Sequence, residues 1–202
     1  MRKIIFRRLL LIALVLSLTK VSISQEALVS DVFGFVAFFP SKAEELIDDN
    51  ALGLFGTFLC AKEVGDELQI YHIVAHKNKQ LLGIETLKKK EYKRVIQKHF
   101  DTFMKADPPM DLKAAWDDSF AWPVIKFSCL RRGFLGEGLV TKQQGFHFFK
   151  NDSMFTVSIH GTGNEDLDAA VTLFFSTFTM TQKIDAIDAN KAGQGGAIEQ
   201  DR

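Results

Sequence analysis

The order of apolar patterns along the chain constrains its fold more than any other feature. Residues 87–105 carry apolar side chains at helical spacing, and residues 166–176 form a second, shorter amphipathic stretch. Most other apolar residues fall into short runs that are continuous or alternate every second residue, as in strands. The predicted strands are residues 32–39, 52–61, 68–76, 120–130, 135–142, 146–150, 154–160 and a closing strand at 177–180. Strands, a long helix, further strands and a short helix predict an α+β fold with helices packed on a largely antiparallel sheet.

One turn fixes the pairing expected near the end of this sheet. Asn151 and Asp152 are the natural turn between the last two long strands. That turn places His147 opposite Thr156. Residues 41–50 are polar and acidic, and both an edge strand and a loop are compatible with them.

The first 24 residues follow the order of a cleaved export signal. A basic start precedes the apolar residues 9–18, and small side chains follow at Ser22 and Ser24, the two positions that define cleavage. The basic residues are Arg2, Lys3, Arg7 and Arg8. As a helix the apolar segment would span roughly 15 Å, about half a bilayer, which disfavours an uncleaved membrane anchor. We therefore expect an exported chain that begins near Gln25 and resides in the periplasm or outside the cell.

The mature chain is expected to be one acidic domain. The sequence holds 25 basic and 25 acidic residues, and five of the basic ones lie within the first 24 residues. The remaining 20 basic and 25 acidic residues give a net charge of −5, which disfavours nucleic-acid binding. The domain is expected to cover residues 25–184. Residues 185–202 are poor in large apolar side chains, and a disordered tail is predicted there.

The two cysteines, Cys60 and Cys129, leave two alternatives open. An oxidising compartment and an even number of cysteines allow a disulfide between them. Both residues also lie in strongly apolar strands, where a free cysteine packs as a small hydrophobic side chain. The sequence does not decide between a disulfide and two packed thiols.

The spacing of the histidines argues against a metal site. His72 and His76 share a strand face, but four residues of strand span roughly 13 Å, which is too far for one ion. His147 and His160 are kept apart in the same way if the predicted turn forms. We expect neither a metal nor another cofactor.

Two glycines after the last long strand resemble the start of a nucleotide-binding loop. Gly161 and Gly163 precede a helix, but the carboxylates within residues 165–168 would repel a pyrophosphate. Thr162 and Glu165 have the spacing of a capping box. A capped turn is therefore predicted.

Two tryptophans bracket the loop before residue 123. Trp116 and Trp122 are candidates for a binding rim, with anchoring in the core as the alternative. The carboxylates of Asp117 and Asp118 between them are expected to be solvated. The sequence contains neither the nucleophile elbow of serine hydrolases nor the paired-histidine motif of zinc proteases. A non-catalytic protein is expected.

The C-terminal third resembles a known family. Residues 145–161, GFHFFKNDSMFTVSIHG, form a hairpin that ends in glycine, and residues 169–178, AAVTLFFSTF, form a helix with an aromatic close. With the strand end FFP at residues 38–40, these segments resemble the PsbP-like α/β/α sandwich proteins, many of them small exported bacterial proteins. The resemblance implies a shared scaffold whose members mostly bind other proteins and have no common catalytic residues.

These observations lead to one functional hypothesis and one alternative. The hypothesis is an exported, non-catalytic binding or accessory protein, whose partner is another envelope or secreted protein. The alternative is a carrier of a small apolar ligand or lipid between sheet and helix, suggested by the 19 phenylalanines.

Overall fold

The computed structural model describes residues 25–50, 53–136, 138–163 and 167–181. The expected export signal at residues 1–24 and the expected tail at residues 185–202 lie outside the described residues, as does the end of the expected domain. Within the described part, the chain combines two antiparallel sheets with two α-helices, which confirms the predicted α+β class.

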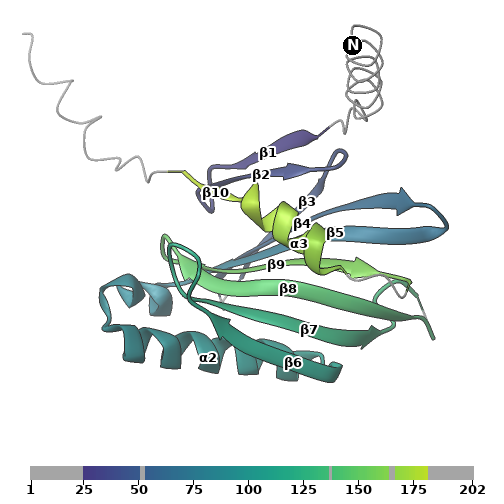
Figure 1. The fold of residues 1–202 in the computed structure, drawn as a ribbon. Helices are drawn as coiled ribbons and strands as arrows, with labels where there is room; N and C mark the ends of the chain where they lie inside the picture. The colour runs from purple at the N-terminus through teal and green to yellow at the C-terminus, as the bar shows by residue number, and fades with distance from the viewer. Residues whose placement is uncertain (1–24, 51–52, 137, 164–166, 182–202) are drawn as a thin grey trace, which may run out of the picture.

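Seven strands form the larger sheet, in the order β3-β4-β5-β9-β8-β7-β6 (Figure 1). They are β3 (Glu44–Asn50), β4 (Gly53–Val64), β5 (Glu67–Lys77), β6 (Met110–Asp117), β7 (Val124–Arg132), β8 (Val140–Lys150) and β9 (Ser153–Gly161). The smaller sheet has the order β1-β2-β10, with β1 (Glu26–Ser30), β2 (Phe35–Phe39) and β10 (Thr179–Met180). Strand β9 is central, and every one of its residues is buried.

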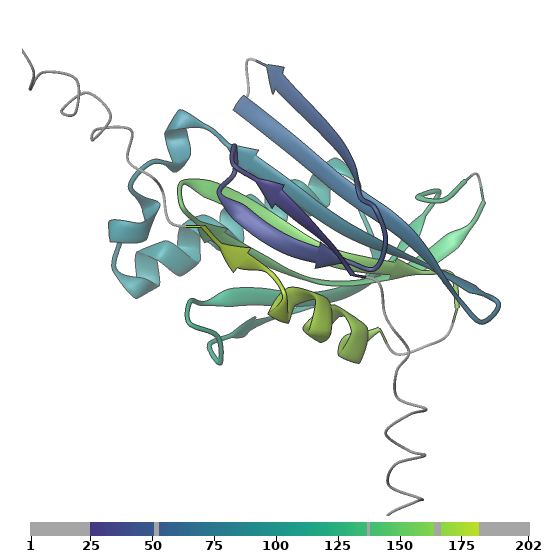
Figure 2. The same cartoon turned by 90° about the horizontal axis from the view of Figure 1, so that it is seen from above.

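Opposite faces of the larger sheet are covered by different elements. The helix α2 (Lys89–Ala106) lies on one face and follows two short 3-10 helices, Lys79–Leu81 and Ile84–Thr86. The helix α3 (Asp168–Ser176) and the smaller sheet lie over the other face (Figures 1 and 2). The hydrophobic core is accordingly divided into two clusters, one on each side of the sheet.

Phenylalanine rings build the cluster beneath α3. The ring of Phe35 meets Phe58 edge to face at 5.1 Å between centroids and stacks on Phe178 at 5.0 Å. Ring pairs in these orientations stabilise a core beyond the area that they bury. Gly56 is needed below them, because a Cβ there would lie 2.4 Å from the ring of Phe33.

Strand boundaries differ from the prediction in the second half of the sheet. The predicted strands 135–142 and 146–150 are parts of one strand, β8. Gly145 in its middle does not interrupt pairing, since its missing side chain leaves room for the Val157 carbonyl oxygen, 2.6 Å from where a Cβ would stand. No strand is predicted at β1 or β6, because both are edge strands whose side chains are mostly exposed and show no apolar alternation. For residues 41–50 the edge-strand alternative is confirmed as β3.

The helix ends also differ from those expected. The helix α3 begins at Asp168, six residues after Thr162. The predicted capping box is wrong at Thr162, because its Oγ1 accepts a hydrogen bond from the Leu68 N–H at 3.0 Å and does not cap the helix. Its expected partner Glu165 lies outside the described residues. The predicted closing strand is confirmed as β10. Neither helix of the described part has the length and apolarity needed to cross a bilayer.

Candidate functional site

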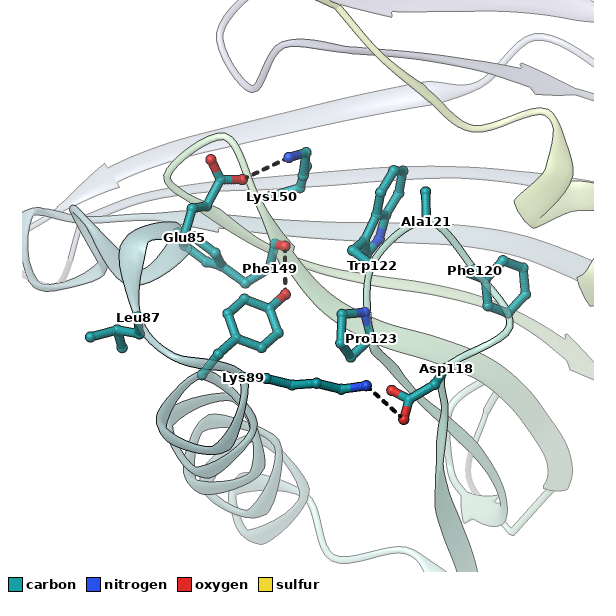
Figure 3. Close-up of a pocket in the computed structure, with 11 residues that line it drawn as sticks. Glu85, Leu87, Lys89, Asp118, Phe120, Ala121, Trp122, Pro123, Phe149 and Lys150 are labelled. Carbon is teal, nitrogen blue, oxygen red and sulfur yellow. Dashed lines mark hydrogen bonds and ion pairs between the residues drawn. The ribbon is translucent and has the colours of Figure 1, made fainter.

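A pocket of about 400 Å³ opens between the start of α2, the loop from β6 to β7 and the end of β8 (Figure 3). The lining residues are Glu85, Leu87, Lys89, Tyr92, Asp118, Phe120, Ala121, Trp122, Pro123, Phe149 and Lys150. Aromatic and apolar side chains therefore predominate in the interior, and charged side chains stand at its edges. A mostly apolar interior with a few polar groups is typical of ligand-binding pockets.

The inner wall of the pocket is fixed by one buried hydrogen bond. Tyr92, in the first turns of α2, donates its hydroxyl hydrogen to the Phe149 carbonyl oxygen at 2.9 Å. Burial raises the pKa of Tyr92 to about 12, so the phenol remains protonated and keeps donating at physiological pH. The bond ties α2 to β8 at the pocket.

Ion pairs stand at two edges of the pocket. Lys150 Nζ lies 3.1 Å from Glu85 Oε1, and Lys89 Nζ lies 3.3 Å from Asp118 Oδ2 (Figure 3). Lys93 Nζ lies 2.9 Å from the same Asp118 oxygen. The hydrogen bond from Lys93 is the main cause that lowers the pKa of the Asp118 carboxyl. Exposed pairs of this kind contribute little stability. Because of these ion pairs, positive and negative charges offset one another at the mouth of the pocket.

The loop that forms the outer wall is held by its own side chains. Asp117 Oδ1 accepts hydrogen bonds from the backbone N–H and the hydroxyl of Ser119, at 2.9 and 2.6 Å. These bonds lower the pKa of Asp117, the hydroxyl contributing most. Phe120 then anchors the loop in the core by meeting Phe175 edge to face at 4.9 Å. The pocket wall is thus preformed.

The structure separates the two tryptophans that sequence analysis proposed as a joint rim. Trp122 lines the pocket, where its ring lies 5.8 Å from Lys150 Nζ. Its indole Nε1 is buried and has no hydrogen-bond partner among the described residues. Trp116 instead packs against the cluster beneath α2, with Lys93 Nζ 4.9 Å from its ring centroid. Trp116 therefore matches the core alternative, and Trp122 is the tryptophan of the pocket.

The histidines lie in two groups on the α2 face of the sheet. His147 pairs with Thr156 across the hairpin, as predicted. His99 of α2, which sequence analysis did not consider, lies between His76 and His147, within 3.3 Å of each. In the second group, the rings of His72 and His160 are 5.7 Å apart.

Burial lowers the pKa of four of the histidines. It is the main cause that lowers the pKa of His72 and of His99 to about 4. It is also the main cause that lowers the pKa values of His147 and His160 well below the ordinary value. No group of three or more histidine, cysteine, aspartate or glutamate side chains in the described ranges is arranged to hold a metal ion.

The two cysteines lie in different parts of the core. Cys60 belongs to the cluster under α3 and Cys129 to the cluster under α2, on opposite faces of the sheet. Three strands separate β4 from β7, so these strands are roughly 19 Å apart, whereas the Cα atoms of a disulfide lie within about 7 Å. Both thiols are free and buried, and the disulfide alternative is therefore corrected to two packed cysteines. Burial raises the pKa of each.

Comparisons with solved structures add a likeness of fold. No protein-family model matches the chain, and no curated protein matches it. The solution structure of cyanobacterial PsbP (CyanoP) from Synechocystis sp. PCC 6803 is similar, with 12% sequence identity and a TM-score of 0.40. The match covers 78% of this chain and 93% of that chain. A likeness at this level does not establish a family or a function.

Proposed function

We propose that this chain is an exported, non-catalytic binding protein on a PsbP-like scaffold, and that it recognises another envelope or secreted protein through the pocket at the start of α2. The observation that carries the proposal is the preformed aromatic pocket of about 400 Å³ with ion pairs at its edges. Export is supported by the order of basic, apolar and small residues at the start of the sequence, and the scaffold by the motifs at residues 145–161 and 169–178.

The chemistry of the pocket favours an apolar side chain. Leu87, Phe120 and Trp122 offer apolar surface in its lining. Because the carboxylates of Glu85 and Asp118 are already paired with lysines, the pocket has no strong preference for a charged ligand. A partner loop that inserts one aromatic or aliphatic anchor meets this requirement.

The carrier alternative has less support. It was suggested by the abundance of phenylalanine, and many of these rings fill the cluster between the sheet and α3. For example, Phe146 and Phe175 stack at 4.4 Å, and Phe148 and Phe155 at 5.3 Å. Rings packed in this way stabilise the core, so the phenylalanine content no longer argues for a ligand cavity.

Site-specific photo-crosslinking in the native envelope tests the binding proposal. A photoreactive residue at Leu87, which is exposed and lines the pocket, should form an adduct with one protein. The same residue at Leu46, exposed on β3, is the matched control and should not. Ala121→Arg, which fills the mouth, should abolish the Leu87 adduct, whereas Leu46→Arg should leave it unchanged. Equal adducts from both positions, or none from Leu87, would contradict the proposal, and a lipid adduct would favour the carrier.

Export is tested separately by the intact mass of the protein recovered from the envelope or medium. The mass should correspond to a chain that begins at Gln25. A species that retains Met1 would contradict cleavage and indicate a tethered protein.

A further inference from the structure

We propose that His76, His99 and His147 form a one-directional chain of neutral imidazoles that holds α2 on the sheet and releases it when the chain gains a proton. The three rings come from β5, α2 and β8, so the chain crosses the interface between helix and sheet. His76 Nδ1 lies 3.3 Å from His99 Nε2, and His99 Nδ1 lies 3.3 Å from His147 Nε2. At the far end His147 Nδ1 lies 2.8 Å from Thr156 Oγ1.

The direction of the chain is set by Asn78. The Asn78 Oδ1 accepts a hydrogen bond from the Gln80 backbone N–H at 2.8 Å, which fixes the orientation of the amide. The Asn78 Nδ2, 3.2 Å from His76 Nε2, can therefore only donate to that nitrogen. A neutral His76 must then carry its hydrogen on Nδ1 and donate it to His99.

The same reasoning passes along the rest of the chain. His99 accepts at Nε2, so its hydrogen is on Nδ1 and is donated to His147 Nε2. His147 likewise carries its hydrogen on Nδ1 and donates it to the hydroxyl oxygen of Thr156. All three rings are thus expected as Nδ1–H tautomers, and every ring nitrogen has one partner.

An added proton has no acceptor in this arrangement. A proton on His147 Nε2 would face the N–H of His99. If His99 and then His76 changed tautomer in response, the conflict would only move to His76 Nε2, which would face the Asn78 amide N–H. Wherever the proton is placed, two of these donors point at each other across the interface between helix and sheet, which is costly. Release of α2 into water removes the conflict.

Uncharged groups contact the chain from two further strands. Thr156 comes from β9, and the ring of Phe55 of β4 stacks on His76 at 4.1 Å. Strand pairing places Asp48 of β3 beside Phe55, one strand further from His76. Phe100 and Phe103 of α2 lie 5.4 and 6.0 Å from His147.

Charged groups further away hold the two ends of α2. Asp118 pairs with Lys89 and Lys93 at the start of the helix, and Asp107 follows its end and pairs with Arg131. Because its pKa is lowered, Asp118 stays ionised between pH 7.5 and 5, so its ion pairs do not account for a release in that range.

Release of α2 would also change the pocket. Tyr92, which forms the inner wall, is about two helical turns before His99 on α2, and Phe149 is two residues beyond His147 on β8. Acidification is therefore expected to open the pocket wall. This last step rests on the proposed function, whereas the clamp itself does not.

The tautomers are tested directly on the purified protein by imidazole ¹⁵N NMR at pH 7.5. We expect His76, His99 and His147 to be Nδ1–H tautomers, each with its Nε2 unprotonated. A single Nε2–H ring among the three would overturn the chain. This measurement needs no variant and no partner, so its outcome is independent of the pocket's function.

Hydrogen exchange of α2 tests the release. Consider one imidazole that can take up a proton only after α2 is released and then has the ordinary pKa of 6.5. Lowering the pH from 7.5 to 5.0 then shifts the equilibrium about 30-fold toward the open state, and a second proton adds to this shift. Protection factors of residues 92–104 should therefore fall by about 30-fold or more, after correction for intrinsic exchange rates. Unchanged protection would contradict the proposal.

Variants assign the effect to the chain. In the double variant His99→Leu with His147→Leu, protection of α2 should change less than about threefold over the same pH range. The matched control His72→Gln removes a buried histidine outside the chain and should retain the wild-type fall. The clamp is wrong if α2 protection in the double variant falls with pH as it does in the wild type. It is also wrong if one equivalent of bound zinc takes the place of the pH effect. If the double variant does not fold, the NMR measurement on the native chain decides.

Discussion

Arg131 Nε donates a hydrogen bond to Gln143 Oε1 at 2.9 Å, and both side chains are buried between the sheet and α2. Gln143 Nε2 in turn donates to Ser158 Oγ at 3.1 Å, while the Arg131 guanidinium reaches Asp107 at 3.0 Å. The Gln143 amide on β8 therefore links β7 to β9. It also stabilises the charge of Arg131, which is buried away from water.

This relationship predicts the effect of Gln143→Leu. The substitution leaves the Arg131 Nε–H and the Ser158 hydroxyl unpaired in the core, so the free energy of unfolding should fall by about 2–4 kcal/mol. Gln144→Leu is the matched control, because Gln144 Oε1 is buried and has no partner within the described part of the chain, so its removal should be neutral or stabilising. Denaturant unfolding of both variants gives the comparison, and equal losses would contradict the network.

A second prediction concerns the inner wall of the pocket. Tyr92→Phe removes the hydrogen bond to the Phe149 carbonyl and should lower the free energy of unfolding by about 1 kcal/mol. Trp122→Phe deletes an indole N–H that has no partner, so its loss should cost only the packing of the smaller ring. Thermal unfolding measures the first effect. Trp122→Phe should weaken partner binding and leave the Tyr92 hydrogen bond intact.

Stability should decrease as the solution becomes acidic. Burial lowers the pKa of His72 to about 4 from 6.5, so above pH 6.5 this side chain is neutral in both the folded and the unfolded chain. Between pH 6.5 and 4 only the unfolded chain takes up the proton. The free energy of unfolding then falls by up to about 1.4 kcal/mol per pH unit for each such histidine. Denaturant titrations should show a shallower slope for His72→Gln than for the wild type, and identical slopes would refute the assignment.

The two cysteines should titrate as thiols. Protein that is unfolded in denaturant without reductant is expected to react with two equivalents of a thiol reagent, since Cys60 and Cys129 lie on opposite faces of the sheet. In the folded protein the reaction should be slow, because both side chains are buried and their pKa values are raised. Absence of thiols after unfolding would indicate a disulfide formed by another route.

The fold class followed from the sequence because the central strands carry strong apolar patterns. Residues 154–160 are almost wholly buried, and in β5 the side chains of Ile73 and Ala75 alternate with less buried ones, as a strand pattern requires. The strand β6 was missed because it is an exposed edge whose sequence has no such alternation. Pairing across the last hairpin was predictable, since the short turn at Asn151 and Asp152 determines the register.

The candidate site was less accessible from sequence. Trp122 could be named as a candidate for a binding rim, but the ion pair of Glu85 with Lys150 depends on how the segment before α2 returns to the hairpin end. The role of His99 has the same origin, because the helical pattern shows which face of α2 is apolar but not which strand side chains lie beneath it. Contacts between segments far apart in sequence leave no local signal.

The edge strand β3 combines exposed apolar side chains with exposed carboxylates. Leu46 and Ile47 are exposed on a strand whose outer backbone groups are free of a neighbouring strand within the sheet, which is a template for unwanted pairing. Exposed Glu44, Glu45 and Asp49 lie on the same short segment. Two such edges brought together would place like charges side by side, so electrostatic repulsion protects the protein from aggregation near neutral pH, and that protection weakens in acid or high salt.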